Sequence, residues 1–373
     1  MPETYLIAGG GTGGHLYPGI AIAEELKKRR PDARIVFAGR GLPLERSIVE
    51  RHGYALVGIR SGGVVGRSLL GRLSGMANAV RGFFEAGKVI DILKPRAVVG
   101  VGGYASFPMV LAAQARRVPT VVQDQNAVPG LSNRLLGRSA RAIALTYEET
   151  KKFFGGRGTV TGNPIRAEFH QADRDRARRR RASGDPRLHL FVVGGSQGSR
   201  ALNDAVLAAL PHLADRRDRL RFVHGTGPAD ADRVQVAYAA AKFDATVLPY
   251  IEAIRSVYED ADLVVCRSGA STVSELQACG KAAILVPLPT SAHDHQKKNA
   301  EAAARAGAAV LLEQKDLTGS TLASEISRLL DDPRRLEAME RAAAALARPD
   351  AAARIVDLVQ QVEAPAGAAG ARS

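Results

Sequence analysis

Three glycine-rich turns are the segments best suited to chemistry in this 373-residue chain. Each follows an apolar run typical of a strand and precedes a run typical of a helix: Gly9 to His15, Gly100 to Ser106, and Gly194 to Ser199. Glycine lets backbone amides approach an anion without a Cβ in the way, and the following helix adds partial positive charge. One such turn can serve strand–helix packing alone, but three of them favour at least two phosphate-bearing sites.

A more specific constellation lies in the second half of the chain. Residues 262–266 read as a strand, and residues 267–275 read as a turn that opens a helix. Thr272 and Glu275 share one helical face. They form either a capping box with Thr272 as N-cap, or a site where amides at 270–272 hold a phosphate and Glu275 grips a ribose diol. Ligands bind at this carboxyl edge in such sheets, and the loop at 287–299 lies there too.

The pattern of apolar runs predicts the elements that position these turns. Short β-branched runs alternate with longer amphipathic ones, in two series. This alternation predicts an α/β fold class with two doubly wound, Rossmann-like parallel-sheet domains that face a cleft. The predicted strands are 4–8, 34–38, 54–59, 97–100, 119–123, 141–145, 188–193, 220–224, 245–248, 262–265, 282–286 and 309–312.

Turn-forming residues and composition predict the domain boundaries. Thr161-Gly162-Asn163-Pro164 interrupts the pattern, which predicts one domain over 1–164 and another over 165–347. A helix is expected over 17–30, with Pro18 in its first turn. Residues 363–373 are small and are expected to be a disordered tail.

The charge of the chain is unevenly distributed. The net charge is +14, but residues 1–164 carry 23 basic and 11 acidic residues, and the remainder is close to neutral. A basic surface suits nucleic acid, an anionic membrane or a phosphorylated ligand. The run from Arg174 to Arg181 fits a nucleic-acid patch or a solvated helix face. It has no interleaved aromatic residues for base stacking, so we expect no nucleic-acid partner.

Composition excludes several classes of protein. A content of 46% hydrophobic and 24% charged residues is typical of a globular chain rather than a disordered or fibrous one. The two cysteines, Cys266 and Cys279, exclude a four-cysteine metal site and are expected to be buried thiols. We expect no signal peptide before the first strand. The uncharged stretch 97–115 contains glycines and Pro108, so we expect a cytosolic protein with only peripheral membrane contact.

A dinucleotide-dependent oxidoreductase is the second function that the sequence suggests. Gly9, Gly11 and Gly14 satisfy G-x-G-x-x-G, and Arg40, after the second strand, could accept the 2′-phosphate of NADP. The rest of the chain offers no obvious site for hydride transfer.

Five motifs together resemble the MurG family, the N-acetylglucosaminyltransferases that make the lipid-linked disaccharide precursor of peptidoglycan in the bacterial cell wall. The resemblance covers about Tyr5 to Val362. It implies a GT-B fold, UDP-N-acetylglucosamine as donor, lipid I (undecaprenyl-pyrophosphoryl-N-acetylmuramoyl-pentapeptide) as acceptor, and inversion to a β-1,4 linkage. It also implies that a last helix, about 350–362, returns to the first domain. The motifs are Gly10-Gly11-Thr12-Gly13-Gly14-His15, Gly102-Gly103-Tyr104, Gly194-Gly195-Ser196-Gln197-Gly198, Arg267-Ser268-Gly269 with Glu275, and the Gln296 loop.

The resemblance implies a donor site made by both halves of the chain. The backbone of Ile251 would meet uracil, Glu275 the ribose hydroxyls, and Gln296 the sugar. Arg166 and Ser196 would help hold the nucleotide. The implied donor-binding residues are Thr12, Gly13, Gly14, Asn126, Arg166, Ser196, Ile251, Ala270, Ser271, Thr272, Val273, Ser274, Glu275 and Gln296.

The acceptor's pyrophosphate would lie on Gly14, His15, Gly103 and Tyr104. His15 is the first candidate for the catalytic base, because an imidazole pKa near ~6.5 suits proton removal at neutral pH. It could equally hydrogen-bond a phosphate or cap the helix. Asp124 is the second candidate, although it could instead orient Asn126. Here the sequence reads Gln-Asp-Gln-Asn at 123–126, where the family usually has His-Glu-Gln-Asn.

We expect no metal and no other cofactor. The helix that begins near Ser271 can stabilise the leaving diphosphate through oriented amides. The Asp-x-Asp triplets at 173–175, 230–232 and 260–262 are interpreted as helix-end or surface carboxylates. The family often has a second glutamine after the equivalent of Gln296, and Lys297 in its place could face solvent.

The segment 60–85 is a candidate membrane face. On sequence alone it also fits an amphipathic core helix, but the resemblance implies a first domain that docks on the membrane. The implied partners are the sugar nucleotide, the undecaprenyl-linked acceptor, the anionic cytoplasmic face of the cell membrane, and other cell-wall synthesis proteins. The predicted membrane residues are Arg67, Leu69, Leu73, Met76, Val80 and Phe83.

Overall fold

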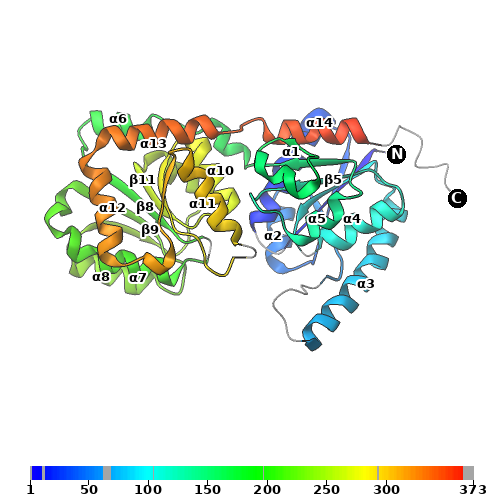
Figure 1. Ribbon diagram of the computed structural model, residues 1–373, viewed down its shortest axis with the longest axis horizontal. Helices are drawn as coiled ribbons and strands as arrows, with labels where there is room; N and C mark the ends of the chain where they lie inside the picture. Colours follow the sequence, from blue (N-terminus) through cyan, green and yellow to red (C-terminus); the bar gives the residue numbers. More distant parts are fainter. Residues whose placement is uncertain are drawn as a thin grey trace. The chain divides into compact units, whose positions relative to one another are not determined.

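The computed structural model describes residues 2–10, 13–61, 69–103, 105–195, 197–291 and 294–363, except the side chains of 69–77. The chain divides into two compact units. The first unit comprises Met1–Arg166 and Arg348–Ser373, and the second comprises Ala167–Ala347. Each unit is a parallel sheet covered by helices (Figure 1).

The sheet of the first unit has seven strands among the described residues, in the order β3-β2-β1-β4-β5-β6-β7. Its order reverses between β1 and β4, which is the doubly wound arrangement that creates a ligand crevice at the carboxyl edge. The strands are β1 (Thr4–Gly9), β2 (Arg34–Gly39), β3 (Ala55–Gly58), β4 (Ala97–Gly102), β5 (Thr120–Asp124), β6 (Ala142–Leu145) and β7 (Thr159–Val160).

Helices cover both faces of this sheet because successive side chains of a strand point to opposite faces. Ile7 packs with α1 and α14 on one face. Leu6 packs with α3 and α4 on the other. The helices are α1 (Gly13–Arg29), α2 (Pro43–Arg51), α3 (Leu69–Leu93), α4 (Ser106–Ala115), α5 (Leu131–Gly137) and α14 (Ala351–Val362).

The second unit repeats this plan with six strands among the described residues, in the order β10-β9-β8-β11-β12-β13. Its order reverses between β8 and β11, so the ligand crevice is expected where these two strands end. The strands are β8 (Leu188–Val193), β9 (Leu220–Gly225), β10 (Asp244–Leu248), β11 (Leu263–Cys266), β12 (Ala282–Leu285) and β13 (Ala309–Leu311).

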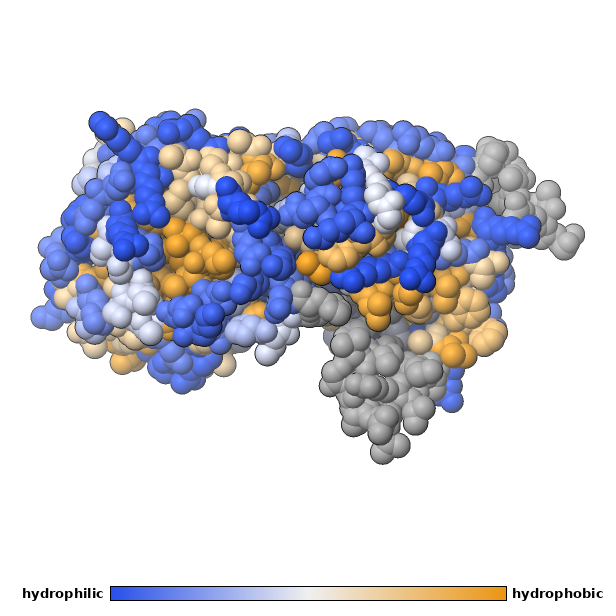
Figure 2. Space-filling view, viewed as in Figure 1, coloured by the Kyte–Doolittle hydropathy of each residue, from blue (hydrophilic) through white to orange (hydrophobic). Residues whose placement is uncertain are grey.

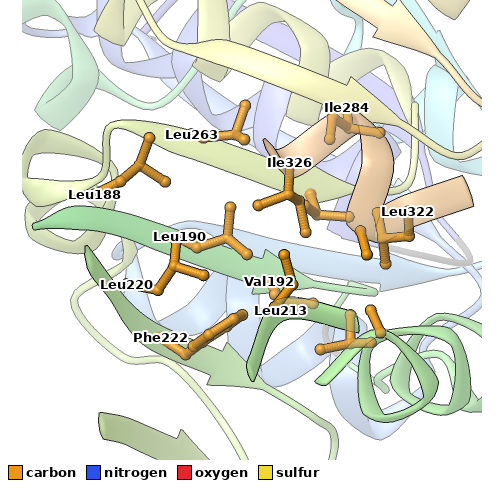
Figure 3. Close-up of a cluster of buried hydrophobic side chains, with 14 of the residues drawn as sticks. Leu188, Leu190, Val192, Leu213, Leu220, Phe222, Leu263, Ile284, Leu322 and Ile326 are labelled. Carbon is orange, nitrogen blue, oxygen red and sulfur yellow. The ribbon is translucent and has the colours of Figure 1, made fainter. Parts of the chain in front are cut away.

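A large apolar cluster fills one side of the second sheet. Figure 3 shows side chains of β8 and β9, including Leu190 and Phe222, facing Leu322 and Ile326 of α12. The two cysteines are buried thiols on β11 and α10. The helices are α6 (Arg176–Ala182), α7 (Arg200–Ala209), α8 (Ala231–Ala240), α9 (Ile254–Asp260), α10 (Ala270–Cys279), α11 (His295–Arg305), α12 (Gly319–Asp331) and α13 (Pro333–Leu346).

The Arg-rich run lies on α6 and is engaged in ion pairs within the second unit. Arg180 and Arg181 both pair with the buried carboxylate of Asp262. Arg176 pairs with Asp260 at 2.7 Å. Because these guanidinium groups already meet carboxylates at the end of α9 and directly before β11, the structure favours a helix face over a nucleic-acid patch.

Helix α14 completes the core of the first unit after the chain has passed through the second. Ile355 and Val359 are fully buried in the cluster that also contains Ile7. The sequence analysis assigned Glu363 to a disordered tail, but Glu363 is ordered in the structure. It pairs with Arg30 at 2.5 Å and accepts a hydrogen bond from the hydroxyl of Tyr5 at 2.5 Å. Residues 364–373 lie outside the described part of the chain.

Sequence patterning predicts the twelve longer strands, but two details differ. Helix α1 begins at Gly13 rather than at residue 17, so Pro18 lies inside the helix and not in its first turn. His15 therefore stands in the first turn of α1. Strand β7 was not predicted, since it is a two-residue strand at the sheet edge.

Candidate active site

Two of the glycine turns pack against each other at the switch point of the first unit. Gly103 has φ +83° and lies so close to Gly10 that a Cβ would overlap the Gly10 carbonyl oxygen. Gly102 has φ +95°, and a Cβ there would lie 2.8 Å from Nδ1 of His15. The turns after β1 and β4 therefore need glycine for contact with each other and with His15.

His15 is held from β4 and from the loop after β5. Its Nδ1 lies 3.2 Å from the carbonyl oxygen of Val101 and 2.8 Å from Nε2 of Gln125. Gln125 is 6% exposed. The ring is thus fixed at the carboxyl edge of the sheet, where a ligand of the first unit is expected.

Asp124 orders the loop that carries Gln125 and Asn126. Its Oδ1 accepts the backbone N–H of Asn126 at 2.9 Å, and its Oδ2 accepts Nδ2 of Asn133 at 2.9 Å. Burial raises the pKa of this carboxyl to about 6, against the opposing effect of these hydrogen bonds. The geometry favours loop positioning over proton transfer, because both oxygens are engaged inside the unit.

In the second unit, α10 begins at Ala270 with Gly269 as its N-cap. Thr272 lies inside the first turn, so the capping-box interpretation with Thr272 as N-cap is wrong. The amides of residues 270–272 lie at the helix end that carries partial positive charge and can donate to an anion. The amide of Val273 is not available to an anion in the same way, because it donates to the Gly269 carbonyl at 3.0 Å. The side chain of Val273 is also buried.

Arg267 is a buried cation to which the sequence analysis assigned no role. It follows β11 and is 9% exposed. Nη1 donates to the carbonyls of Val286 and Pro287 at 3.2 Å each, and Nη2 donates to Oε1 of Gln314 at 2.7 Å. Among the described residues no carboxylate lies within ion-pair distance of this guanidinium. Burial consequently lowers the pKa of Arg267.

The same edge gathers three other predicted donor residues. Glu275 is 8% exposed on α10. Gln296 lies in the first turn of α11, where its Oε1 accepts the Leu288 amide at 3.0 Å and its carbonyl accepts Oγ of Ser268 at 2.9 Å. Ile251 packs against the end of β9, since a Cβ on Gly225 would lie 2.6 Å from its Cδ1. Ser271 and Ser274 are partly exposed on α10.

Two sequence models match this chain and together cover most of it. The glycosyltransferase family 28 N-terminal domain matches residues 5–145, and the family's C-terminal domain matches residues 189–355.

The chain belongs to glycosyltransferase family 28.

Curated relatives in this family match nearly the full chain. A protein of Anaeromyxobacter sp. (strain K) is 45% identical over 96% of this chain and 92% of its own length. One of Thermodesulfovibrio yellowstonii is 40% identical over 96% of this chain and 98% of its own. Both are named UDP-N-acetylglucosamine–N-acetylmuramyl-(pentapeptide) pyrophosphoryl-undecaprenol N-acetylglucosamine transferase.

Solved structures confirm the GT-B architecture of two Rossmann-like units. MurG of Acinetobacter baumannii has a TM-score of 0.80 and 30% identity, with 96% of this chain and all of that chain covered. A UDP-N-acetylglucosamine 2-epimerase from Neisseria meningitidis has a TM-score of 0.67 at 12% identity, covers 96% of this chain and all of that chain, and supports the fold alone. Family membership leaves the oxidoreductase alternative without support.

The remaining donor and acceptor residues predicted for this family 28 protein fall into two groups. Arg166 belongs to the first unit, where its guanidinium lies 4.9 Å from the ring centroid of Tyr17. Gly13 and Gly14 lie in the first turn of α1 beside His15. Thr12, Tyr104 and Ser196 lie outside the described residues, as does Arg67, one of the predicted membrane residues.

The Asp-x-Asp triplets are bound to arginines rather than arranged as metal clamps. Asp173 pairs with Arg179, and Asp262 with Arg180. Asp230 accepts Nε of Arg233 at 2.9 Å, and its pKa is lowered to about 2, chiefly by that hydrogen bond. Within the described ranges, no group of three or more His, Cys, Asp or Glu side chains is placed to hold a metal ion.

The predicted membrane helix is α3, but its exposed face differs from the prediction. Val80 is 57% exposed as expected. Phe83 is instead partly buried, because it packs against the core cluster that contains Leu6. Phe84 is 63% exposed. The side chains of Leu69, Leu73 and Met76 are not described. Across the described chain, no helix has the length and hydropathy needed to span a bilayer.

Exposed apolar side chains also lie on two neighbouring helices of the first unit. Figure 2 shows hydrophobic residues beside hydrophilic ones around α4 and α5. Leu111 of α4 is 37% exposed, and Leu131 and Leu135 of α5 are 52% and 41% exposed. We call these three residues, with Val80 and Phe84, the apolar face.

Proposed function

We propose that this protein transfers N-acetylglucosamine from UDP-N-acetylglucosamine to the 4-hydroxyl of the muramoyl sugar of lipid I, with inversion, to give lipid II for peptidoglycan. The observation that carries this proposal is the match to curated transferases of that name over 96% of the chain. The site geometry in each unit supports it independently.

The donor's diphosphate would bind at the start of α10. The amides of Ala270 and Thr272 offer donors there, and Arg267 supplies a positive charge that no described carboxylate neutralises. As the bond from the anomeric carbon to the phosphate oxygen breaks, its electron pair leaves on UDP. Fixed donors at that position stabilise the developing charge without reorganisation.

The rest of the donor would be recognised by three residues of the second unit. Glu275, 8% exposed on α10, accepts the ribose hydroxyls. Ile251 presents its backbone to uracil. The Oε1 of Gln296 is occupied by the Leu288 amide, so the amide nitrogen of Gln296 is the group that donates to a sugar oxygen.

The acceptor would be activated by His15. Its imidazole takes the proton of the 4-hydroxyl while that oxygen forms the bond to the anomeric carbon, so the proton ends on the ring as UDP departs. General-base help of this kind is typically worth about 10²–10⁴ in rate. The two glycine turns that contact His15 offer backbone amides to the acceptor's pyrophosphate, and Gly14 and Gly103 are among the residues that supply them.

The acceptor's lipid requires contact with a membrane, for which the apolar face of the first unit is suited. The same helices carry basic residues: Arg81 and Lys88 are exposed on α3, and Arg134 lies in α5 between Leu131 and Leu135 in the sequence. A basic side chain near an anionic bilayer contributes about 1 kcal/mol. We propose a peripheral location on the cytoplasmic face of the membrane, where other cell-wall synthesis proteins would also meet it.

A transfer assay tests the proposed function. The full chain is incubated with UDP-N-acetylglucosamine labelled in the sugar and a short-chain lipid I analogue, and the product's anomeric configuration is read by NMR. A labelled β-linked disaccharide is expected. Titration with UDP, NADPH and a DNA duplex provides the comparison, and binding of NADPH without UDP would overturn the proposal.

A further inference from the structure

The surroundings of His15 Nδ1 contain a conflict. The carbonyl oxygen of Val101, at 3.2 Å, can only accept, so it requires a hydrogen on Nδ1. The amide nitrogen of Gln125, at 2.8 Å, can only donate, so it requires a lone pair on the same atom. One ring nitrogen cannot satisfy both groups.

The conflict is removed by turning the side-chain amide of Gln125. The oxygen and nitrogen of an amide have nearly the same shape and are assigned from their hydrogen bonds. As placed, Oε1 of Gln125 is buried and has no hydrogen-bond partner among the described residues. Exchanging the two atoms brings an acceptor next to Nδ1, while the Val101 carbonyl is held in β4 and cannot turn.

We propose that Gln125 is a positioning residue that, with the Val101 carbonyl, holds the ring hydrogen of His15 on Nδ1 and leaves the basic lone pair on Nε2. This inference rests on the proposed function, in which His15 takes the acceptor's proton. A base must present its lone pair to the proton it removes, and the partner of the other nitrogen decides which one that is.

The same contacts favour the charged ring that follows proton transfer. An imidazolium donates from both nitrogens, so both oxygen atoms near Nδ1 remain satisfied when Nε2 gains the acceptor's proton. With the opposite orientation of Gln125, an N–H of its side-chain amide would point at the Nδ1–H of the imidazolium. Gln125 thus performs, as a neutral amide, the orienting task of the carboxylate in a Ser-His-Asp triad.

The loop around Gln125 is built to hold such an orientation. Asp124 fixes Asn126 through its backbone and Asn133 through its side chain. Thr150 donates to the carbonyl of Asn126 at 3.3 Å. Because residues on both sides of Gln125 are bonded, the amide meets His15 from a fixed backbone.

Nitrogen-15 NMR of the full chain labelled at histidine tests the tautomer directly, without substrate. The signals of His15 are identified by their loss in His15→Gln. Wild-type protein at about pH 8, where a free imidazole is neutral, is expected to carry the hydrogen on Nδ1. Gln125→Met removes both polar atoms and should lower the fraction of rings that carry the hydrogen on Nδ1, since the Val101 carbonyl at 3.2 Å is then the only one of the two groups left to favour it. Gln125→Glu keeps an acceptor and should retain the hydrogen on Nδ1.

Activity provides the second measurement. We expect Gln125→Met to lower kcat about 10- to 100-fold, a share of what general-base help supplies, with the KM for the sugar nucleotide unchanged. Gln125→Glu should recover most of this loss. Gln123→Met is the matched control, since it removes another buried glutamine, which bonds Asn163 at 3.2 Å, and it should leave the His15 tautomer unchanged.

The outcomes separate this inference from the proposed function. A wild-type ring protonated on Nε2, or a tautomer that Gln125→Met does not change, overturns the role of Gln125 even if transfer is normal. Loss of the Nδ1 hydrogen in Gln125→Glu overturns it as well. Failure of the wild type to transfer the sugar, with Nδ1 protonated, overturns the proposed function instead.

Discussion

The guanidinium of Arg267 donates two hydrogen bonds to the hydroxyl of Ser199, from Nε at 3.2 Å and from Nη2 at 2.8 Å. This pair joins the end of β11 to the glycine turn after β8, across the point where the strand order reverses. The acceptors around Arg267 are neutral, so its orientation is fixed while its charge is left for an anion.

Arg267→Lys should weaken UDP binding about tenfold, because the positive charge would no longer be held in position beside the diphosphate. A lysine ammonium cannot reproduce the planar fork that reaches Ser199 and the two carbonyls. Calorimetric titration with UDP measures the effect. Arg200→Lys is the control, because Arg200 is exposed and pairs with Asp204 and Asp230. Equal affinity in Arg267→Lys and wild type would contradict the assignment.

Glu275→Gln should also lower UDP affinity, by about tenfold or more, because a carboxylate accepts hydroxyl hydrogen bonds more strongly than an amide does. The loss should disappear with 2′,3′-dideoxyuridine diphosphate, which lacks both ribose hydroxyls. Titration of variant and wild type with the two ligands measures this coupling. A loss of the same size for both nucleotides would show that Glu275 acts on the fold and not on the ribose. Glu337→Gln, on α13, serves as the control.

Phe84→Glu combined with Val80→Glu should reduce cosedimentation with phosphatidylglycerol vesicles, with stability within about 0.5 kcal/mol of wild type, because both side chains are exposed. Phe83→Glu should instead destabilise the first unit, since Phe83 packs against its core. Val236→Glu is a matched control, because Val236 is 68% exposed on α8 of the second unit. Vesicle binding reduced equally by Val236→Glu would argue against the apolar face.

Removal of divalent metal should leave transfer intact. Carboxylates of each Asp-x-Asp triplet are engaged by arginines, and under the proposed function the start of α10 with Arg267 would supply the charge that a metal would otherwise offer. Initial rates are compared before and after EDTA, then after addition of Mg²⁺ or Mn²⁺. Activity that disappears with EDTA and returns with metal would make this account inadequate.

His224 should make the second unit less stable in acid. It is buried between Asn203 and Tyr238, and burial lowers its pKa to about 4. Between pH 6.5 and 4 the unfolded chain binds a proton that the folded chain does not, so stability falls as the pH falls, by up to about 3 kcal/mol.

The thermal unfolding midpoint measured across that range checks this prediction. His224→Gln should flatten the decline, and His212→Gln, at an exposed position, should not. An unchanged slope in His224→Gln would refute the role of His224.

The parallel sheets could be predicted because each buried strand is a continuous apolar run followed by a turn. The glycine turns could be predicted because their backbone requires glycine. Gly103, for example, adopts positive φ and lies too close to the backbone of Gly10 for a residue with a Cβ. The start of α10 was harder, since Thr272 and Glu275 match a capping pattern. Gly269 takes the N-cap position instead.

Contacts between distant parts of the chain could not be predicted from the sequence. Gln125 meets His15 across 110 positions, and no local pattern marks that pairing. On α3, Phe83 and Phe84 are adjacent, and helical periodicity alone does not say which of them faces the sheet. Arg267 stands within a recognisable motif, but only the folded unit shows that none of the described carboxylates pairs with it.

The return of α14 to the first unit has a consequence for the order of folding during synthesis. Residues 351–363 leave the ribosome after the whole of the second unit, yet Ile355 and Val359 fill the core around β1. Domains generally fold in the order in which they emerge, but here the second unit has its complete sequence first. The unit that holds His15 therefore cannot complete its hydrophobic core until α14 has been translated.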